Sequence, residues 1–289
     1  MTGNYFHILK WMFLAWLLPA VSLAQQFQTT PSSAMNVLVC YPGGSIRTQD
    51  AQSAMGSMLR ALEETGGWTA GTMKGLFATE INDCTKILSD QKPQFAITTL
   101  GIFLESREKL NLIPLVQPRI KGSSSDIYRI VVRQGTFKSI EELKGKTLGG
   151  PLVAEPTFLK RVIFQGKVDP LSFFELKGSR RVLRSLRDVA KGKLDAVIIN
   201  AQQHSALSSL PFVDELQVVF TSEEIPLVGV VANGQRTTAG ERNRFSRALS
   251  KMCTHQDGKP LCELFGVEAF VPVDMTAFGT VFQLWDSTR

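Results

Sequence analysis

Small polar residues that could hold a solute follow two of the predicted strands. Tyr41 ends the first strand, Gly43 and Gly44 follow it, and Thr98 and Thr99 end the third. Tyrosine could stack on a solute, and backbone amides and hydroxyls suit a polar ligand group beside a helix N-terminus. Each residue also has a structural alternative: a packed ring, a simple turn, or a helix cap at Thr99. We predict all five as ligand contacts.

Two adjacent arginines could bind an anion. Arg180 and Arg181 open a predicted helix, and guanidinium groups capture carboxylate or phosphate in a bidentate way. More cations follow along the helix, so a solvated basic face is the alternative. Asn200, after the next strand, could donate or accept a hydrogen bond from a ligand, or hold its own loop. We include these three residues in the predicted site.

No catalytic motif accompanies these residues. The sequence contains neither GxSxG nor HExxH, and His204 and His255 lie in polar segments without an evident partner. An enzyme needs a nucleophile, a base and an orienting group together. We therefore predict a protein that is not an enzyme and that uses no cofactor.

Four cysteines follow the N-terminal segment: Cys40, Cys84, Cys253 and Cys262. An even number in an exported chain indicates disulfides. We favour Cys40–Cys84, which falls within one predicted lobe, and Cys253–Cys262, which is close in sequence. Zinc is the rival, but the sequence has no CxxC and its histidines do not cluster with the cysteines, so we predict no metal.

The first 24 residues are typical of a cleavable signal peptide. Lys10 precedes the apolar run 11–18, and small residues at Ser22 and Ala24 suit a signal peptidase. The run is too short for a bilayer span of about 20 residues, which disfavours the alternative of an uncleaved anchor. The residue directly after the cleavage site is Gln25 rather than a cysteine, so we predict a soluble periplasmic protein without a lipid anchor. Residues 25–34 are rich in Gln, Thr and Ser and predict a flexible leader.

Composition excludes two broad classes of protein. Hydrophobic residues make up 44% and charged residues 20%, as in an ordinary globular chain rather than a disordered one. The formal net charge is +6, and Lys10 is the only charged residue that cleavage would remove. This positive charge is smaller than that of a typical nucleic-acid-binding protein, and export also disfavours a nucleic-acid partner.

The hydrophobic pattern alternates between strands and helices. We expect strands at 35–41, 69–77, 95–99, 112–118, 126–133, 173–176, 196–200 and 227–232, and a turn, short helix and strand over 139–148. We expect helices at 48–64, 157–165, 180–191 and 239–252, and one capped by Thr79 that ends near residue 90. Gly145 and Gly192 fit left-handed helix ends, and Asp195 fits a local cap or pair. This rhythm predicts α/β lobes with parallel strands.

Four segments resemble the phosphate/phosphonate family of periplasmic solute-binding proteins. They are residues 126–132, 138–148, 178–197 and 224–227, and the likeness is strongest from 126 to 200. The resemblance implies a type II periplasmic binding protein of the α/β class, with two lobes that each hold a mainly parallel sheet flanked by helices. It implies lobe 1 over 35–125, completed by 226–289, and lobe 2 over 126–225. It also places Tyr128 on a crossing strand beside the cleft.

One loop departs from the family pattern. Members that bind phosphonate carry a Ser/Thr-rich loop whose hydroxyls and amides hold the oxyanion, whereas residues 149–158 keep a single hydroxyl, Thr157. Glu155 brings a negative charge, and Pro151 and Pro156 remove two amide donors. We keep Thr157 as a predicted ligand contact, but the loop weakens the expectation of an anionic ligand. A cationic or zwitterionic solute, or no small ligand at all, becomes an alternative.

The function expected from this reading is solute capture. The resemblance implies a monomer that closes two lobes on a small polar ligand, anionic in the family, and presents it to an inner-membrane ABC permease or a sensor kinase. Two alternatives stay open: a periplasmic interaction or sensory protein without a ligand, and, with less support, an enzyme on this fold.

Overall fold

The computed structural model describes residues 34–40, 42 and 48–287. The predicted signal peptide, nearly all of the leader, and the candidate contacts Tyr41, Gly43 and Gly44 lie outside the described residues. Among the described residues, no helix is both long enough and apolar enough to cross a membrane.

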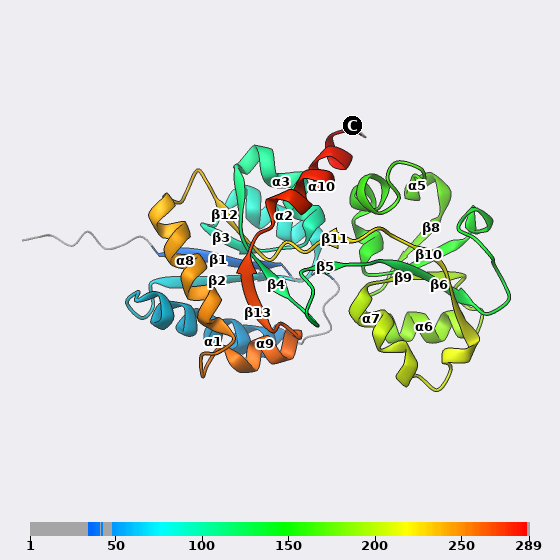
Figure 1. Ribbon diagram of the computed structural model, residues 1–289, viewed down its shortest axis with the longest axis horizontal. Coiled ribbons are helices and arrows are strands. Elements are labelled where there is room, and N and C mark those ends of the chain that lie inside the picture. Colours follow the sequence, from blue (N-terminus) through cyan, green and yellow to red (C-terminus); the bar gives the residue numbers. More distant parts are fainter. Residues whose placement is uncertain (1–33, 41, 43–47, 288–289) are drawn as a thin grey trace, which may run out of the picture. The chain divides into compact units, whose positions relative to one another are not determined.

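The first sheet has six strands in the order β13-β4-β12-β3-β1-β2 (Figure 1). β1 is parallel to β2 and β3, whereas β12 is antiparallel to β3 and β4, and β13 is antiparallel to β4. The strands are β1 Met35–Cys40, β2 Met73–Ala78, β3 Phe95–Ile97, β4 Leu112–Arg119, β12 Val230–Asn233 and β13 Ala269–Pro272. The predicted parallel βαβαβ unit is therefore confirmed, and antiparallel strands extend it.

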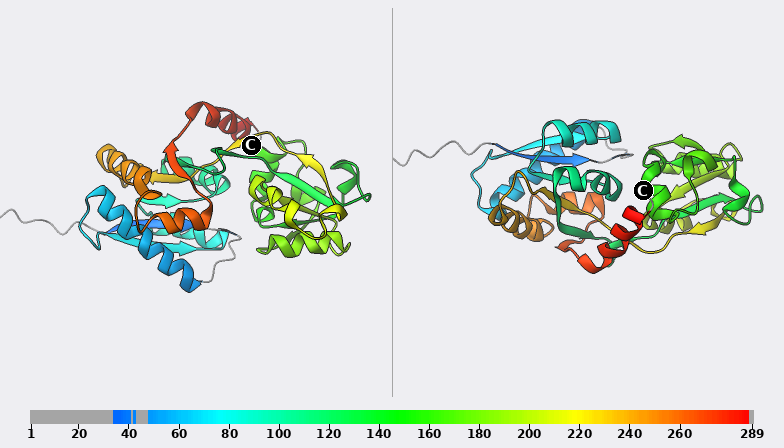
Figure 2. Two further views of the ribbon diagram at one scale, coloured as in Figure 1. Left: turned by 60° about the horizontal axis from the view of Figure 1, so that its bottom comes forward. Right: turned by 90° about the horizontal axis from the view of Figure 1, so that it is seen from above.

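Helices cover both faces of this sheet, and in the view from above in Figure 2 the teal α2 and α3 lie opposite the orange α8 and α9. They are α1 Thr48–Gly66, α2 Ile81–Asp90, α3 Leu100–Leu110, α8 Ala239–Met252 and α9 Lys259–Phe265. The last helix, α10 Met275–Ser287, packs on α3, where the rings of Phe278 and Phe103 meet edge to face. Successive side chains of a strand point to opposite faces, so Leu38 packs with the α2 and α3 side and Val37 with the α1, α8 and α9 side. On the second side the buried rings of Phe95 and Phe245 stack with centroids 3.7 Å apart.

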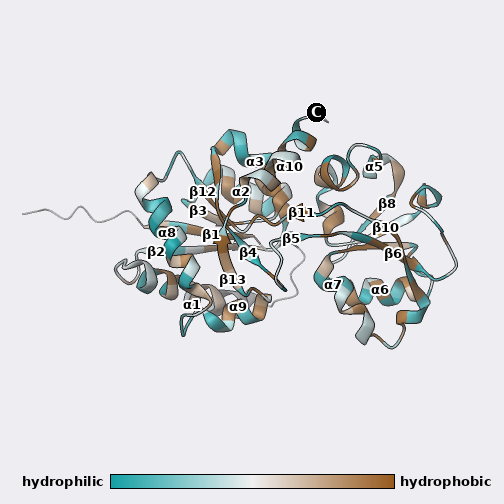
Figure 3. Cartoon of the chain, in the orientation of Figure 1, coloured by the Kyte–Doolittle hydropathy of each residue, from teal (hydrophilic) through white to brown (hydrophobic). Residues whose placement is uncertain are grey.

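The second sheet has five strands in the order β10-β6-β9-β7-β8. They are β6 Arg129–Arg133, β7 Thr147–Gly150, β8 Glu175–Gly178, β9 Ala196–Ile199 and β10 Leu216–Thr221. β7 is parallel to β8 and β9, and β6 is antiparallel to β9 and β10. Figure 3 shows the apolar strands of both sheets in brown. These strands can be apolar on both faces because helices cover both faces of each sheet.

Short helices surround the second sheet. The α-helices are α4 Pro156–Phe158, α5 Pro170–Phe173, α6 Val182–Ala190 and α7 Ala201–Ser205, and a π-helical turn, η3 Leu159–Ile163, continues α4. The 3-10 turns are η1 Glu141–Leu143, η2 Leu152–Ala154, η4 Leu207–Ser209 and η5 Val213–Glu215. Gly145 and Gly192 have φ of 73° and 67°, so both take the left-handed conformation expected after a helix. Asp195 accepts hydrogen bonds from the backbone and hydroxyl of Thr147, which confirms its local role.

Two short strands join the sheets. β5 Ser125–Asp126 follows β4 into the second sheet, and β11 Ile225–Pro226 leads from β10 back to β12. They pair antiparallel, Ile225 opposite Asp126 and Pro226 opposite Ser125. The chain therefore passes from one sheet to the other and back through a single two-stranded ribbon.

Several predicted boundaries were wrong. Thr79 does not cap α2, because Glu80 occupies the N-cap and makes no side-chain cap bond. β2 begins at Met73 rather than 69, and β12 begins at Val230 rather than 227. The helix expected at 157–165 is a short α-helix followed by a π turn. β10 was not predicted at all.

The two disulfides join the pairs that the sequence analysis favours. Cys40 at the end of β1 bonds Cys84 in α2, with Cα atoms 5.7 Å apart. Cys253 after α8 bonds Cys262 in α9, with Cα atoms 5.4 Å apart. The first bond therefore ties α2 to β1 of the six-stranded sheet, and the second ties α9 to the end of α8.

Candidate ligand-binding site

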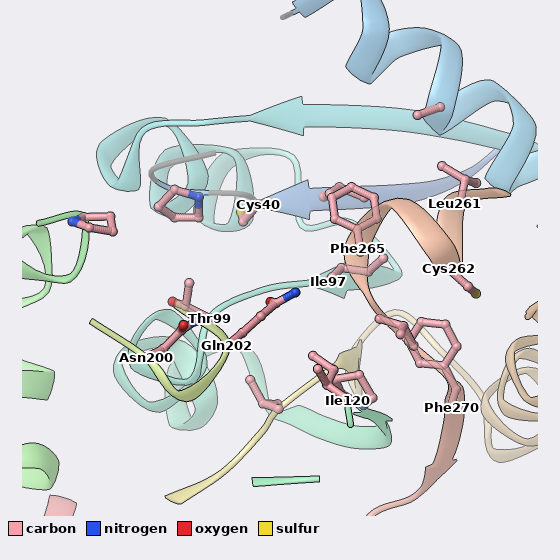
Figure 4. Close-up of a pocket in the computed structure, with 18 of the residues that line it drawn as sticks. Cys40, Ile97, Thr99, Ile120, Asn200, Gln202, Leu261, Cys262, Phe265 and Phe270 are labelled. Atoms are coloured by element: carbon pink, nitrogen blue, oxygen red, sulfur yellow. The ribbon is translucent and has the colours of Figure 1, made fainter. Parts of the chain in front are cut away.

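A cavity of about 440 Å³ lies where residues of both sheets meet. This volume falls within the roughly 300–1,000 Å³ of ordinary small-molecule sites. Three of the predicted contacts line it: Thr99 after β3, Tyr128 before β6, and Asn200 after β9. Figure 4 shows Thr99 and Asn200 at the cavity. The ends of strands β3 and β9 thus bring together residues that lie far apart in the sequence, as expected for a site in an α/β fold.

Helix capping fixes two of these polar side chains. Thr99 is the N-cap of α3, and its hydroxyl accepts a hydrogen bond from Ile102 N at 3.2 Å. Asn200 is the N-cap of α7 and forms a capping box with Gln203, with bonds of 2.8 and 3.0 Å. Each cap locks its rotamer. The cavity therefore presents Thr99 and Asn200 in defined positions.

Glu155 places a carboxyl group at the N-terminus of α3. Its side chain is 7% exposed, and Oε2 accepts a hydrogen bond of 2.9 Å from the Thr99 hydroxyl. The Ile102 amide also donates to this carboxyl. A Cβ on Gly101 would overlap Oε2, so only glycine lets the carboxyl approach so closely. Glu155 thus occupies the position that a helix N-terminus offers to an anion.

Burial makes this carboxyl a weak acid. Desolvation, with the charge of Glu105 adding to it, raises the pKa of Glu155 to about 7, against the opposing hydrogen bonds from Thr99 and Ile102. Burial also raises the pKa of Asp126 beside the cavity, against hydrogen bonds from Ala201 and Ile127. The pKa of the partly buried Tyr128 is raised well above its usual value by desolvation and by the charges of Asp126 and Glu155. The titratable groups at the polar end of the cavity are therefore all acids, and burial raises the pKa of each.

Among the described residues that line the cavity, none is a lysine or an arginine. The predicted anion ligands Arg180 and Arg181 instead line a separate polar hollow with Lys177, Arg184 and Lys193. Arg180 forms an ion pair there with Glu80, at the start of α2. The structure does not bring the two arginines to the cavity of Thr99 and Asn200.

Two further predicted contacts lie off the cavity wall. Thr157 hydrogen-bonds the Glu105 carboxyl, and Thr98 is buried with its hydroxyl unpaired among the described atoms. Sequence reasoning did not include an apolar wall from α1, α9 and β13 in the site. No signal could have revealed it, because cavity-lining and core residues share the same hydrophobic spacing. Among the described residues, no group of His, Cys, Asp or Glu is arranged to hold a metal.

Solved structures with this architecture are two-lobed binding proteins. A binding-protein component of an ABC phosphonate transporter from Pseudomonas aeruginosa is 16% identical, with a TM-score of 0.66 and coverage of 87% of this chain and 85% of that one. XAC2383 from Xanthomonas citri, bound to ATP, is 15% identical, with a TM-score of 0.68 and coverage of 89% and 97%. PhnD1 from Prochlorococcus marinus, in complex with methylphosphonate, is 14% identical, with a TM-score of 0.65 and coverage of 89% and 98%. At these identities the likeness shows the fold.

The family follows from the sequence itself. The sequence model described as "ABC transporter, phosphonate, periplasmic substrate-binding protein" matches residues 46–278. The chain therefore belongs to this family of periplasmic substrate-binding proteins, which bind a small molecule and present it to an ABC transporter. No curated protein matches the chain.

Proposed function

We propose that this chain captures a neutral or cationic solute rather than a phosphonate. The position of the Glu155 carboxyl at the N-terminus of α3 carries this proposal. An anionic ligand that used the same amides would meet a buried carboxyl already bonded to Thr99 and Ile102. Two like charges at one helix end repel, whereas an ammonium or hydroxyl head finds an acceptor there.

The surroundings of Glu155 support the same ligand class. Glu105 and Asp126 add acidic groups nearby, and the described cavity wall supplies no cationic side chain. Methylphosphonate is the ligand of PhnD1, a protein only 14% identical. The departure of residues 149–158 from the family pattern then reflects a changed ligand within an unchanged fold.

Closure of the lobes accounts for capture. The hydrogen bond from Thr99 to Glu155 and the ion pair of Arg180 with Glu80 both join residues of the six-stranded sheet's lobe to the other. The ribbon of β5 and β11 is the hinge about which the lobes separate. We infer lobe 1 over 35–125 with 226–289 and lobe 2 over 126–225.

Delivery and export complete the proposal. The closed monomer docks on an inner-membrane ABC permease, with a sensor kinase as the second receiver. The chain reaches the periplasm through the signal peptide at 1–24 and carries no lipid anchor. It binds without catalysis, in keeping with its family of substrate-binding proteins.

A thermal-shift panel tests the ligand class. The mature protein is heated with methylphosphonate, phosphate, amino acids or polyamines, since any ligand of the native state raises the unfolding temperature by mass action. We expect cationic and neutral compounds to raise it at millimolar concentration and phosphonate to leave it unchanged. Stabilisation by methylphosphonate alone would overturn the proposal.

Glu155→Ser is expected to admit an anion. The serine removes the buried charge that opposes an anion at the N-terminus of α3, so affinity for methylphosphonate should rise about tenfold, equal to about 1.4 kcal/mol. Calorimetric titration measures the gain. Glu215→Ser, which removes an exposed carboxylate of η5, is the matched control and should change nothing. Equal affinities for the wild type and Glu155→Ser would show that the carboxyl does not block the anion position.

A further inference from the structure

The cavity extends beyond its polar end into an apolar arm. We define the apolar arm by residues that line the cavity and lie on the side of the sheet covered by α1, α8 and α9: Val39, Met55, Met58, Phe77, Ile97, Leu261, Phe265 and Phe270. Figure 4 shows Leu261, Phe265 and Phe270 on one side of the cavity and Thr99, Asn200 and Gln202 on the other. The cavity is therefore polar at one end and apolar at the other.

The floor of the apolar arm is an end of the hydrophobic core that the described residues cover only in part. Val39 lies in register with Phe77 on β2 and with Ile97 on β3, so the three side chains form one row on the sheet. Val37 and Phe95, in the row before them, are fully buried, whereas the row at the arm is only partly buried. Among the residues that the structure describes, core packing thus stops one row short of the carboxyl ends of the strands, and the cavity there has space for an apolar group.

The walls of the arm come from α1, α9 and β13. Met58 lies on α1, and Leu261 and Phe265 lie on α9, which the Cys253–Cys262 bond ties to the end of α8. Phe270 is held on β13 by its pairing with Pro118 on β4. One wall is thus fixed by a disulfide and a strand pair, while methionine side chains can adapt to the shape of a ligand.

We propose that the ligand is amphipathic, with an alkyl or aryl body in the apolar arm and a polar head beside Thr99 and Asn200. Only the non-anionic character of the head rests on the function proposed above. The body follows from the arm alone, because covering partly exposed apolar side chains with an apolar group lowers the free energy. A solute as small as methylphosphonate leaves the arm empty.

Two homologous series separate the head from the body. The wild-type protein is titrated calorimetrically with n-alkylamines and with n-alkylphosphonates, each from methyl to octyl. We expect affinity to rise about fourfold for each added methylene until the arm is full. The offset between the two series tests the proposed function, and the slope within either series tests the apolar arm. A flat slope in the series that binds would overturn the inference, whichever head the protein prefers.

Two variants on α9 test whether the dependence of affinity on chain length arises in the apolar arm. Leu261→Trp fills the arm and should abolish the dependence on chain length, so that long and short alkylamines bind within about twofold of each other. Leu264 lies on the same helix but is 60% exposed. Leu264→Trp is therefore the matched control and should keep the wild-type slope.

A variant in a second wall of the arm keeps the test valid if Leu261→Trp does not fold. Met58→Phe narrows the arm from α1 and should shorten the chain length at which affinity stops rising. Unfolding curves of each variant establish that it is folded. A wild-type slope in folded Leu261→Trp and in folded Met58→Phe would show that the body binds elsewhere.

Discussion

Glu155→Gln is expected to flatten the fall in stability between about pH 5 and pH 7. The folded-state pKa of Glu155 lies near 7, above its unfolded value of 4.5, because the carboxyl is buried. The folded protein therefore holds this proton more tightly than the unfolded chain, and stability falls as pH rises through that window. The shift corresponds to about 3 kcal/mol at its largest. Urea unfolding at half-unit pH steps measures the difference between wild type and variant.

Asp195→Asn is the control of opposite sign. Burial raises the pKa of Asp195, but the two hydrogen bonds from Thr147, with Lys146 and Lys177 nearby, together lower it below 3.8. This residue therefore stabilises the fold at neutral pH, and its contribution is lost as pH falls. Glu105 and Asp126 near Glu155 titrate in both wild type and Glu155→Gln, so subtraction removes most of their effect. Parallel pH curves for wild type and Glu155→Gln would contradict the buried, proton-holding carboxyl.

Replacing Cys40 and Cys84 together by alanine is expected to cost about 4 kcal/mol of unfolding free energy. The bond closes a loop between residues 44 apart, whereas Cys253 and Cys262 are 9 apart. A longer loop restricts the unfolded chain more, so the same replacement at Cys253 and Cys262 should cost about 3 kcal/mol.

The comparison between the two double variants is the informative measurement. Urea unfolding of the mature protein under oxidising conditions gives both costs, and reducing agent should bring the wild type toward the variants. Cys40 and Cys84 are both buried, so alanine is chosen to avoid adding a buried hydroxyl. A larger cost at Cys253–Cys262 would show that its role is to hold the native α9 rather than to restrict the unfolded chain.

Periodicity predicted the regular elements and missed the irregular ones. α8 matches its predicted bounds, because Thr238 forms a capping box with Glu241 that marks its start in the sequence. α2 lacks such a mark, because its N-cap Glu80 makes no side-chain cap bond. The cap predicted at Thr79 therefore lies one residue too early. β10 lies at the edge of its sheet and has a mixed burial pattern. Its sequence therefore lacks the regular alternation of apolar and polar residues that would predict a strand.

The site was predictable where it follows strand ends and, through the family resemblance, at Tyr128. Thr99 and Asn200 lie after β3 and β9, and general rules for α/β folds place such residues together. Glu155 stood out in the sequence as a charge in an unusual loop, but its contact with Gly101 depends on how two distant segments meet. Arg180 matched anion chemistry by type, yet its position by α2 depends on the same tertiary arrangement.

Calorimetric titration of the wild-type protein with n-hexylamine and n-hexylphosphonate at pH 8 tests the central claim most directly. At this pH most of the Glu155 carboxyl is ionised, given a pKa of about 7. The two probes share one alkyl chain, so their difference reports only on the head. We predict that the amine binds at least about tenfold more tightly, a difference of about 1.4 kcal/mol. Tighter binding of the phosphonate would contradict a cleft whose anion position is filled by Glu155.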